Sequence, residues 1–156
     1  MELLAPAGNA ASLKAAVYSG ADAVYLGMDL FNARAKADNF NSENISQYID
    51  FCHLYGVKVY IAFNTCVKDK EMDMLRLRVR AAADAGADAF IVTDIGAMDI
   101  FRASGVPLHA STQMGIHNLE GALMAKELGF KRIVLSRECR MEDIVSVKKS
   151  GLEIEV

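Results

Sequence analysis

Long hydrophobic runs are missing from this sequence, although 53% of its 156 residues are hydrophobic. No apolar run approaches the ~20 residues that a membrane-spanning helix needs, so we expect no membrane partner. The first six residues also lack the basic segment and the long apolar segment of a signal peptide. We therefore expect a cytoplasmic protein, with residues 1–156 forming a single domain around a substantial core.

Cysteine spacing typical of metal sites and an excess of positive charge are missing too. There are three cysteines, Cys52, Cys66 and Cys139, which is an odd number, and no two of them have CxxC spacing. We therefore expect reduced thiols, and no metal site built from these three. The formal net charge of −3 gives no general electrostatic attraction to nucleic acid. The HExxH, GxSxG and Walker motifs are absent, so the sequence leaves the catalytic residues unknown.

The sequence does contain a glycine that ends a helix-like stretch a few residues before an apolar run, and this arrangement occurs six times. The six glycines are Gly20, Gly56, Gly86, Gly105, Gly129 and Gly151. A glycine just past a helix readily takes the left-handed conformation that caps it. The apolar runs that follow are short and do not alternate with polar residues, which is typical of strands buried on both faces.

This pattern predicts seven strands that alternate strictly with six helices. The strands are expected at residues 2–5, 23–26, 57–63, 89–92, 108–111, 132–135 and 152–156. Strict alternation implies parallel strands joined by right-handed crossovers. An open doubly wound sheet and a (β/α)8 TIM barrel both fit that description. The barrel is favoured, because no glycine-rich phosphate loop follows the first strand and polar residues end nearly every strand.

A complete barrel has eight strands, so the sequence predicts a TIM-barrel-like α/β fold truncated after about seven. We interpret the chain as an N-terminal fragment of a longer protein. The first and seventh strands would then be open edges, which favour pairing with another chain, and we expect the fragment to self-associate.

The carboxyl ends of the strands in such a barrel form one mouth, where substrates bind. Six residues at these strand ends or in the following loops are the predicted substrate-binding residues: Arg34, Asn64, Asp94, Gln113, Arg137 and Glu138. A small polar or anionic ligand would suit this set, with the two arginines as anchors. Structural alternatives stay open, because Asp94 is equally suited to cap a helix and Gln113 to satisfy loop backbone.

Five of these stretches, taken in order, resemble one protein family. They are ELLAPAG at residues 2–8, GADAVYLG at 20–27, FNAR at 31–34, HASTQ at 109–113 and LSRE at 135–138. Together they are similar to the N-terminal region of the collagenase-like peptidases, peptidase family U32. Residues 153–156 resemble the strand just before a cysteine-containing segment of that family.

The resemblance implies that the chain is part of a larger enzyme. Three alternative functions are compatible with it. Some members were first named as proteases of no established catalytic type. Others take part in hydroxylation of transfer RNA, ribosomal RNA or ubiquinone, and the leading hypothesis is RNA base hydroxylation. The alternatives are a protease, and a non-catalytic metabolite-binding scaffold or accessory subunit for ubiquinone hydroxylation. The resemblance also implies an iron–sulfur cluster on four cysteines outside this chain, and RNA binding through segments outside it.

Overall fold

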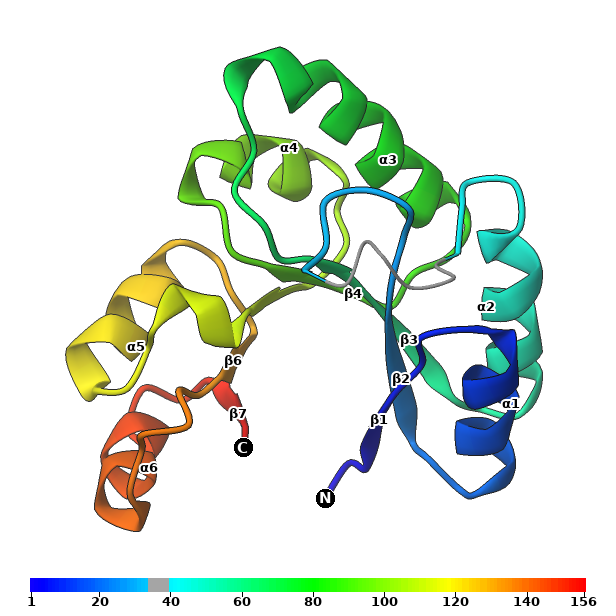
Figure 1. The fold of residues 1–156 in the computed structure, drawn as a ribbon. Coiled ribbons are helices and arrows are strands. Elements are labelled where there is room, and N and C mark those ends of the chain that lie inside the picture. Colours follow the sequence, from blue (N-terminus) through cyan, green and yellow to red (C-terminus); the bar gives the residue numbers. More distant parts are fainter. Residues whose placement is uncertain (34–39) are drawn as a thin grey trace.

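The computed structural model describes residues 1–33 and 40–156, and this part of the chain contains the predicted seven strands and six α-helices (Figure 1). The strands are β1 (Leu4–Pro6), β2 (Ala23–Gly27), β3 (Lys58–Phe63), β4 (Ala89–Val92), β5 (Leu108–Ala110), β6 (Arg132–Val134) and β7 (Glu153–Glu155). The α-helices are α1 (Ala10–Tyr18), α2 (Ile45–Leu54), α3 (Met72–Asp84), α4 (Met98–Ala103), α5 (Leu119–Glu127) and α6 (Met141–Lys148). Short 3-10 helices are η1 (Asp69–Glu71), η2 (Ile95–Ala97) and η3 (Thr112–Met114).

Helix ends follow the local sequence closely. Asn9 caps α1 by accepting a hydrogen bond from the Ser12 amide, and Asn118 caps α5 in the same way from Gly121. At the other ends, all six glycines predicted to stop helices have positive φ angles, for example 92° at Gly86. A side chain at Gly86 would be strained in this conformation, so glycine is what lets the chain turn from α3 into β4.

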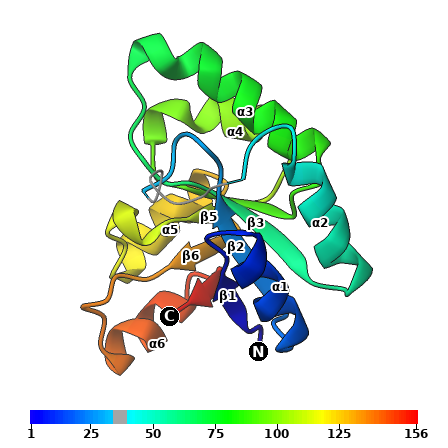
Figure 2. The same cartoon turned by 45° about the vertical axis from the view of Figure 1, so that its right-hand side comes forward.

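All seven strands pair in parallel and in sequence order, from β1 to β7. The sheet curls, and the helices lie on its outer, convex side (Figure 1). Figure 2 shows the same curl from another direction, with the two chain termini near one another in both views. The predicted parallel, barrel-like α/β fold is therefore confirmed.

The main core lies between the convex face of the sheet and the helices. Phe63 and Phe90 on the strands contact Phe101 on α4, with ring centroids 5.3–6.2 Å apart within this trio. All three side chains are almost completely buried. Burying such large apolar groups is the main favourable term that holds the helices on the sheet.

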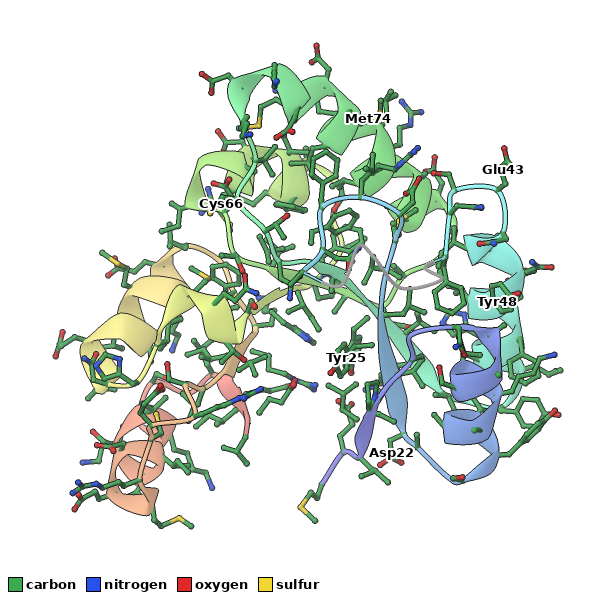
Figure 3. All side chains as sticks on the ribbon, in the orientation of Figure 1. Asp22, Tyr25, Glu43, Tyr48, Cys66 and Met74 are labelled. Atoms are coloured by element: carbon green, nitrogen blue, oxygen red, sulfur yellow. The ribbon has the colours of Figure 1, made fainter. Side chains whose placement is uncertain are left out.

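The concave face is lined differently, with fewer apolar and more polar side chains. Register aligns Ile91, His109, Arg132 and Glu153 on adjacent strands, so these four share that face. Tyr25 on β2 points into the same interior space, away from α1 and α2 (Figure 3). The side chains that face the concave interior therefore alternate along each strand with the side chains that pack in the core.

Within the described residues, β1 and β7 form the two edges of the sheet and do not pair with each other. The open edges are as expected, while self-association through them stays a prediction that light scattering can test. No helix in residues 1–33 and 40–156 is long and apolar enough to cross a membrane.

Candidate functional site

A cavity of about 440 Å³ opens at the carboxyl ends of the strands, on the concave side of the sheet. Its size lies in the range of small-molecule sites in proteins. The lining comes from β1 through β7 and their following loops: Ala7, Gly8, Tyr25, Leu26, Gly27, Asn32, Ala33, Ala62, Asn64, Ile91, Ser111, Thr112, Gln113, Val134, Arg137 and Glu155. This is the barrel mouth that the sequence predicts, and hydrogen-bonding groups are spread around an apolar wall.

Three of the six predicted site residues line this cavity, namely Asn64, Gln113 and Arg137. Asp94 and Glu138 do not line it, and Arg34 lies outside the described residues. Gln113 and Arg137 are exposed, so both side chains are accessible to a ligand. The structure thus brings half of the predicted set to one cavity.

Asn64 organises one wall of the cavity. Its Oδ1 atom accepts a hydrogen bond of 3.0 Å from the amide of Ala33, which fixes the loop after β2 against the end of β3. Phe31 in this loop has a φ of 62°, which is uncommon for a residue other than glycine. Such strained backbone persists only where neighbouring contacts hold it, and it is frequent beside functional sites.

Gly27 and Asn32 meet at the same wall. The Asn32 side chain is buried and donates a hydrogen bond to the carbonyl of Met28. A Cβ atom at Gly27 would lie only 2.5 Å from Cγ of Asn32. Glycine at this position is therefore what allows the buried amide to sit beside the strand end.

Asp94 has a structural role in this fold. Its Oδ2 accepts a 2.7 Å hydrogen bond from the Val67 amide, and its Oδ1 accepts a 2.8 Å bond from the Gly96 amide. The carboxylate therefore caps η2 and ties it to the loop after β3, which is the alternative that the sequence left open.

The loops after β5 and β6 contain turns, and these turns determine how their polar side chains are used. Ser111 accepts a hydrogen bond from the Gln113 amide, so its hydroxyl serves the turn. Because β6 ends at Val134, Arg137 and Glu138 lie in a turn and not on a strand. Of these two neighbours, only Arg137 lines the cavity.

A network of charged groups on the interior side of the sheet centres on Arg132. Its guanidinium donates to Glu2 at 2.6 Å and to Glu153 at 2.7 and 2.9 Å. Glu2 also accepts hydrogen bonds from the Tyr60 hydroxyl at 2.9 Å and from Lys58 at 3.1 Å. These contacts join the segment before β1 to β3, β6 and β7 across the interior.

The network sets the charges inside the curl. Burial raises the pKa of Glu2, but hydrogen bonds from Arg132, Lys58 and Tyr60 outweigh this and hold it at about 2. Burial, with Arg132 nearby, lowers the pKa of His109 to about 4. At neutral pH, Glu2 is therefore charged and His109 is neutral. The His109 ring packs edge-on against Tyr60, with centroids 4.8 Å apart.

Glu155 is the one acidic side chain among the described residues that line the cavity, and sequence reasoning missed it. A signal was present, because glutamates alternate with Ile154 along β7 and Ile154 packs against the main core. Alternation on a barrel strand places the intervening side chains on the interior face. Burial raises the pKa of Glu155, and the charge of Arg132 only partly offsets this.

The cysteines do not supply a metal site in the described part of the chain. Cys52 is buried, Cys66 is exposed and Cys139 is half-buried. Across residues 1–33 and 40–156, no three His, Cys, Asp or Glu side chains gather as a ligand set. The described residues therefore offer no ligand set that fits an iron–sulfur cluster.

The geometry suits binding and orienting a small polar molecule. The described lining offers one cation at Arg137, the amide of Gln113, the hydroxyl of Thr112 and the carboxyl of Glu155. Apolar side chains such as Ile91 and Val134 supply the remaining contact surface. Such a mixed lining is typical of small-molecule sites, where a few polar groups orient the ligand against apolar walls.

Comparisons with known proteins support the resemblance read from the motifs. A family model for peptidase family U32 matches residues 8–156. The tRNA hydroxylation protein P1 of Bacillus subtilis is 40% identical over 99% of this chain and 37% of its own length. The 23S rRNA 5-hydroxycytidine C2501 synthase of Escherichia coli is 36% identical over 96% of this chain and 23% of its own length. The chain thus spans less than two fifths of either relative.

Among solved structures, that of the U32 peptidase Mk0906 superposes with a TM-score of 0.75 at 15% identity. The match covers 99% of this chain and 67% of that one. At this identity the likeness concerns the fold, and it agrees with the curled parallel sheet described above.

Proposed function

The chain belongs to peptidase family U32, and we propose that it forms the barrel part of an enzyme that hydroxylates pyrimidine bases in transfer or ribosomal RNA. The observation that carries this proposal is its identity of 40% and 36%, over nearly its whole length, to two proteins named for RNA hydroxylation. The cavity supports it, because an amide, hydroxyls and a carboxyl beside apolar walls suit a planar base. With RNA as the substrate, we also propose a cytoplasmic location.

The negative charge of RNA favours Arg137 as the residue that binds a substrate phosphate. RNA brings a phosphate beside every base, and a guanidinium binds phosphate oxygens with two parallel hydrogen bonds. The chain carries a net charge of −3, so the remaining affinity for RNA would come from segments outside residues 1–156. We place the iron–sulfur cluster implied by the family in those segments as well.

Mass spectrometry of nucleosides from transfer and ribosomal RNA tests the proposed function. Deleting the gene in the source organism should remove one hydroxylated pyrimidine, and a copy of the wild-type gene should restore it. An unchanged modification profile after deletion would contradict the proposal and would favour the metabolite-binding alternative.

Two arginine variants of the restored gene test the cavity. Arg137→Ala should lower the hydroxylated fraction at least about tenfold, because the lost phosphate contact is worth about 1.4 kcal/mol or more. Arg140→Ala is the matched control, since Arg140 is exposed, pairs with Glu142 at 3.8 Å and does not line the cavity. Equal hydroxylation in both variants would remove Arg137 from the substrate site.

Protease activity finds less support in the described residues. A cysteine nucleophile needs a lowered pKa, whereas burial raises the pKa of Cys52 to about 11. Burial, together with Asp143 and Glu138, also raises the pKa of Cys139. Neither thiol is therefore activated in this part of the chain.

A further inference from the structure

Arg78 differs from the other arginines of α3, because its side chain reaches away from its own helix. Nη2 donates a hydrogen bond of 2.9 Å to Oδ2 of Asp29, and Nη1 donates one of 3.0 Å to Oγ of Ser42. The Arg78 side chain is 23% exposed. Arg76 and Arg80, in contrast, are 63% and 83% exposed and pair with acidic residues of α3 itself. One guanidinium thus joins two points that are distant along the chain.

These two points lie at the ends of the long loop between β2 and α2. Asp29 comes shortly after β2, and Ser42 comes shortly before α2. Figures 1 and 2 show the described parts of this loop passing beside α3. A backbone bridge between Met28 and Phe40, both with buried side chains, also holds the two ends together. The guanidinium therefore adds a second attachment, and it comes from the helix.

The position of the guanidinium is set by both partners, and not by the ion pair alone. Nε of Arg78 and Oδ1 of Asp29 are both buried, and neither has a hydrogen-bond partner among the described residues. Pairing these two atoms as well would give the two parallel hydrogen bonds that an arginine and a carboxylate commonly form. Arg78 lies instead where Nη1 reaches Ser42. This geometry suits a clamp on both ends of the loop.

The first part of the loop forms a wall of the cavity. Asn32 and Ala33 line the cavity a few residues after Asp29. Between them and Asp29, Phe31 has a φ of 62° and packs against the main core. A backbone conformation of this kind persists only while the surrounding contacts hold it. The hydrogen bond from Arg78 to Asp29 is one such contact, and it comes from outside the cavity.

We propose that Arg78 is a positioning residue for the substrate base. By holding Asp29, it places Asn32 and Ala33 at the point where the cavity wall meets the substrate. Arg78 does not itself line the cavity, so its effect passes through the loop. This inference rests on the proposed function, because that function supplies the pyrimidine.

Hydrogen–deuterium exchange of the complete purified protein tests whether Arg78 holds the wall, whatever the substrate. Arg78→Ala should speed exchange of the amides in residues 28–33 at least about tenfold, because a hydrogen bond to a charged group is lost. Arg80→Ala is the matched control on the same helix, since Arg80 is exposed and pairs with Asp84 at 3.6 Å. It should leave exchange in residues 28–33 unchanged.

Hydroxylation in the restored strain tests whether the wall matters to the substrate. Arg78→Lys keeps the charge and should largely keep thermal stability, but a lysine is a single point charge and cannot hold Asp29 and Ser42 together. The hydroxylated fraction, corrected for the amount of soluble protein, should fall about tenfold, because misplaced substrate contacts slow a reaction strongly. A merely structural role would lower hydroxylation only in step with stability.

A double variant tests whether the two contacts act together. Ser42→Ala alone should lower hydroxylation severalfold, and it should add little to Arg78→Lys, in which the contact with Ser42 is already lost. Both variants remain informative where Arg78→Ala fails to fold, because each removes less of the clamp.

Two results would overturn the inference. One is exchange in residues 28–33 that stays at the wild-type rate in folded Arg78 variants, which would show that Arg78 does not hold the wall. The other is full hydroxylation by an Arg78 variant whose wall exchanges faster, which would leave the proposed function standing without a role for Arg78. A deletion strain with unchanged RNA would refute the proposed function itself.

Discussion

Replacing Glu2 by glutamine should destabilise the fold and flatten its response to acid. Glu2 accepts hydrogen bonds from Arg132, Tyr60 and Lys58, and its side chain is 21% exposed. Its pKa falls from 4.5 to about 2. At about 1.4 kcal/mol per pKa unit, with an allowance for the exposed part, the charged form stabilises the folded state by about 2–3 kcal/mol.

The sign of the pH dependence follows from the direction of this change. Because the folded-state pKa of Glu2 is lowered, its contribution is complete above about pH 4.5 and is lost as the pH falls towards about 2. At about pH 3, roughly half of the contribution should remain. The free-energy gap between wild type and Glu2→Gln should therefore be about 2–3 kcal/mol near pH 7 and about half that near pH 3.

Urea unfolding followed by circular dichroism at both pH values measures this gap. Asp73→Asn is the matched control, because the Asp73–Arg76 pair is fully exposed on its acidic side and 3.9 Å long. It should give no measurable change at either pH. A Glu2→Gln gap that is equal at both pH values would refute the electrostatic explanation, and a gap below about 0.5 kcal/mol near pH 7 would refute the importance of the network.

Two further substitutions test the walls of the cavity. Gly27→Ala should cost about 1–3 kcal/mol of stability and reduce hydroxylation in the restored strain, because the new Cβ would collide with Asn32. Gly8→Ala should cost much less stability, since nothing lies within 4 Å of its added Cβ. Asp94→Ala should lower stability by about 1–2 kcal/mol through the lost cap and the lost contact with Val67, while uridine affinity stays unchanged. Thermal melts and calorimetry check both, and a fall in affinity for the Asp94 variant alone would return that residue to the binding site.

The order of strands and helices could be predicted because it depends on local signals. Each helix ends where a glycine adopts a positive φ, and the following apolar run forms the next strand. These signals act within a few residues of the chain, so they can be read without knowledge of the rest. The same holds for the caps at Asn9 and Asn118.

The candidate site could be predicted only in part. The sequence predicted that the carboxyl ends of the strands would meet at one opening. The cavity lies there, and Asn64, Gln113 and Arg137 line it. Asp94 shows the limit of this reasoning, because a residue after a strand can turn its side chain to a nearby helix start as readily as to the mouth. Which of the two happens depends on backbone direction after the strand, and the sequence does not show it.

By itself, the sequence determined the alternating parallel fold, the mouth of the barrel and the family. The tertiary structure decided the state of the charges inside the curl. Glu2 and Glu155 lie 153 positions apart, yet the bending of the sheet brings both to the same nitrogen of Arg132. Glu2 accepts the hydrogen bond from that nitrogen, and its pKa is lowered. Glu155 lines the cavity, and its pKa is raised. Pairing between distant residues sets such a balance, because electrostatic energy depends on distance and burial in space and not on position along the chain.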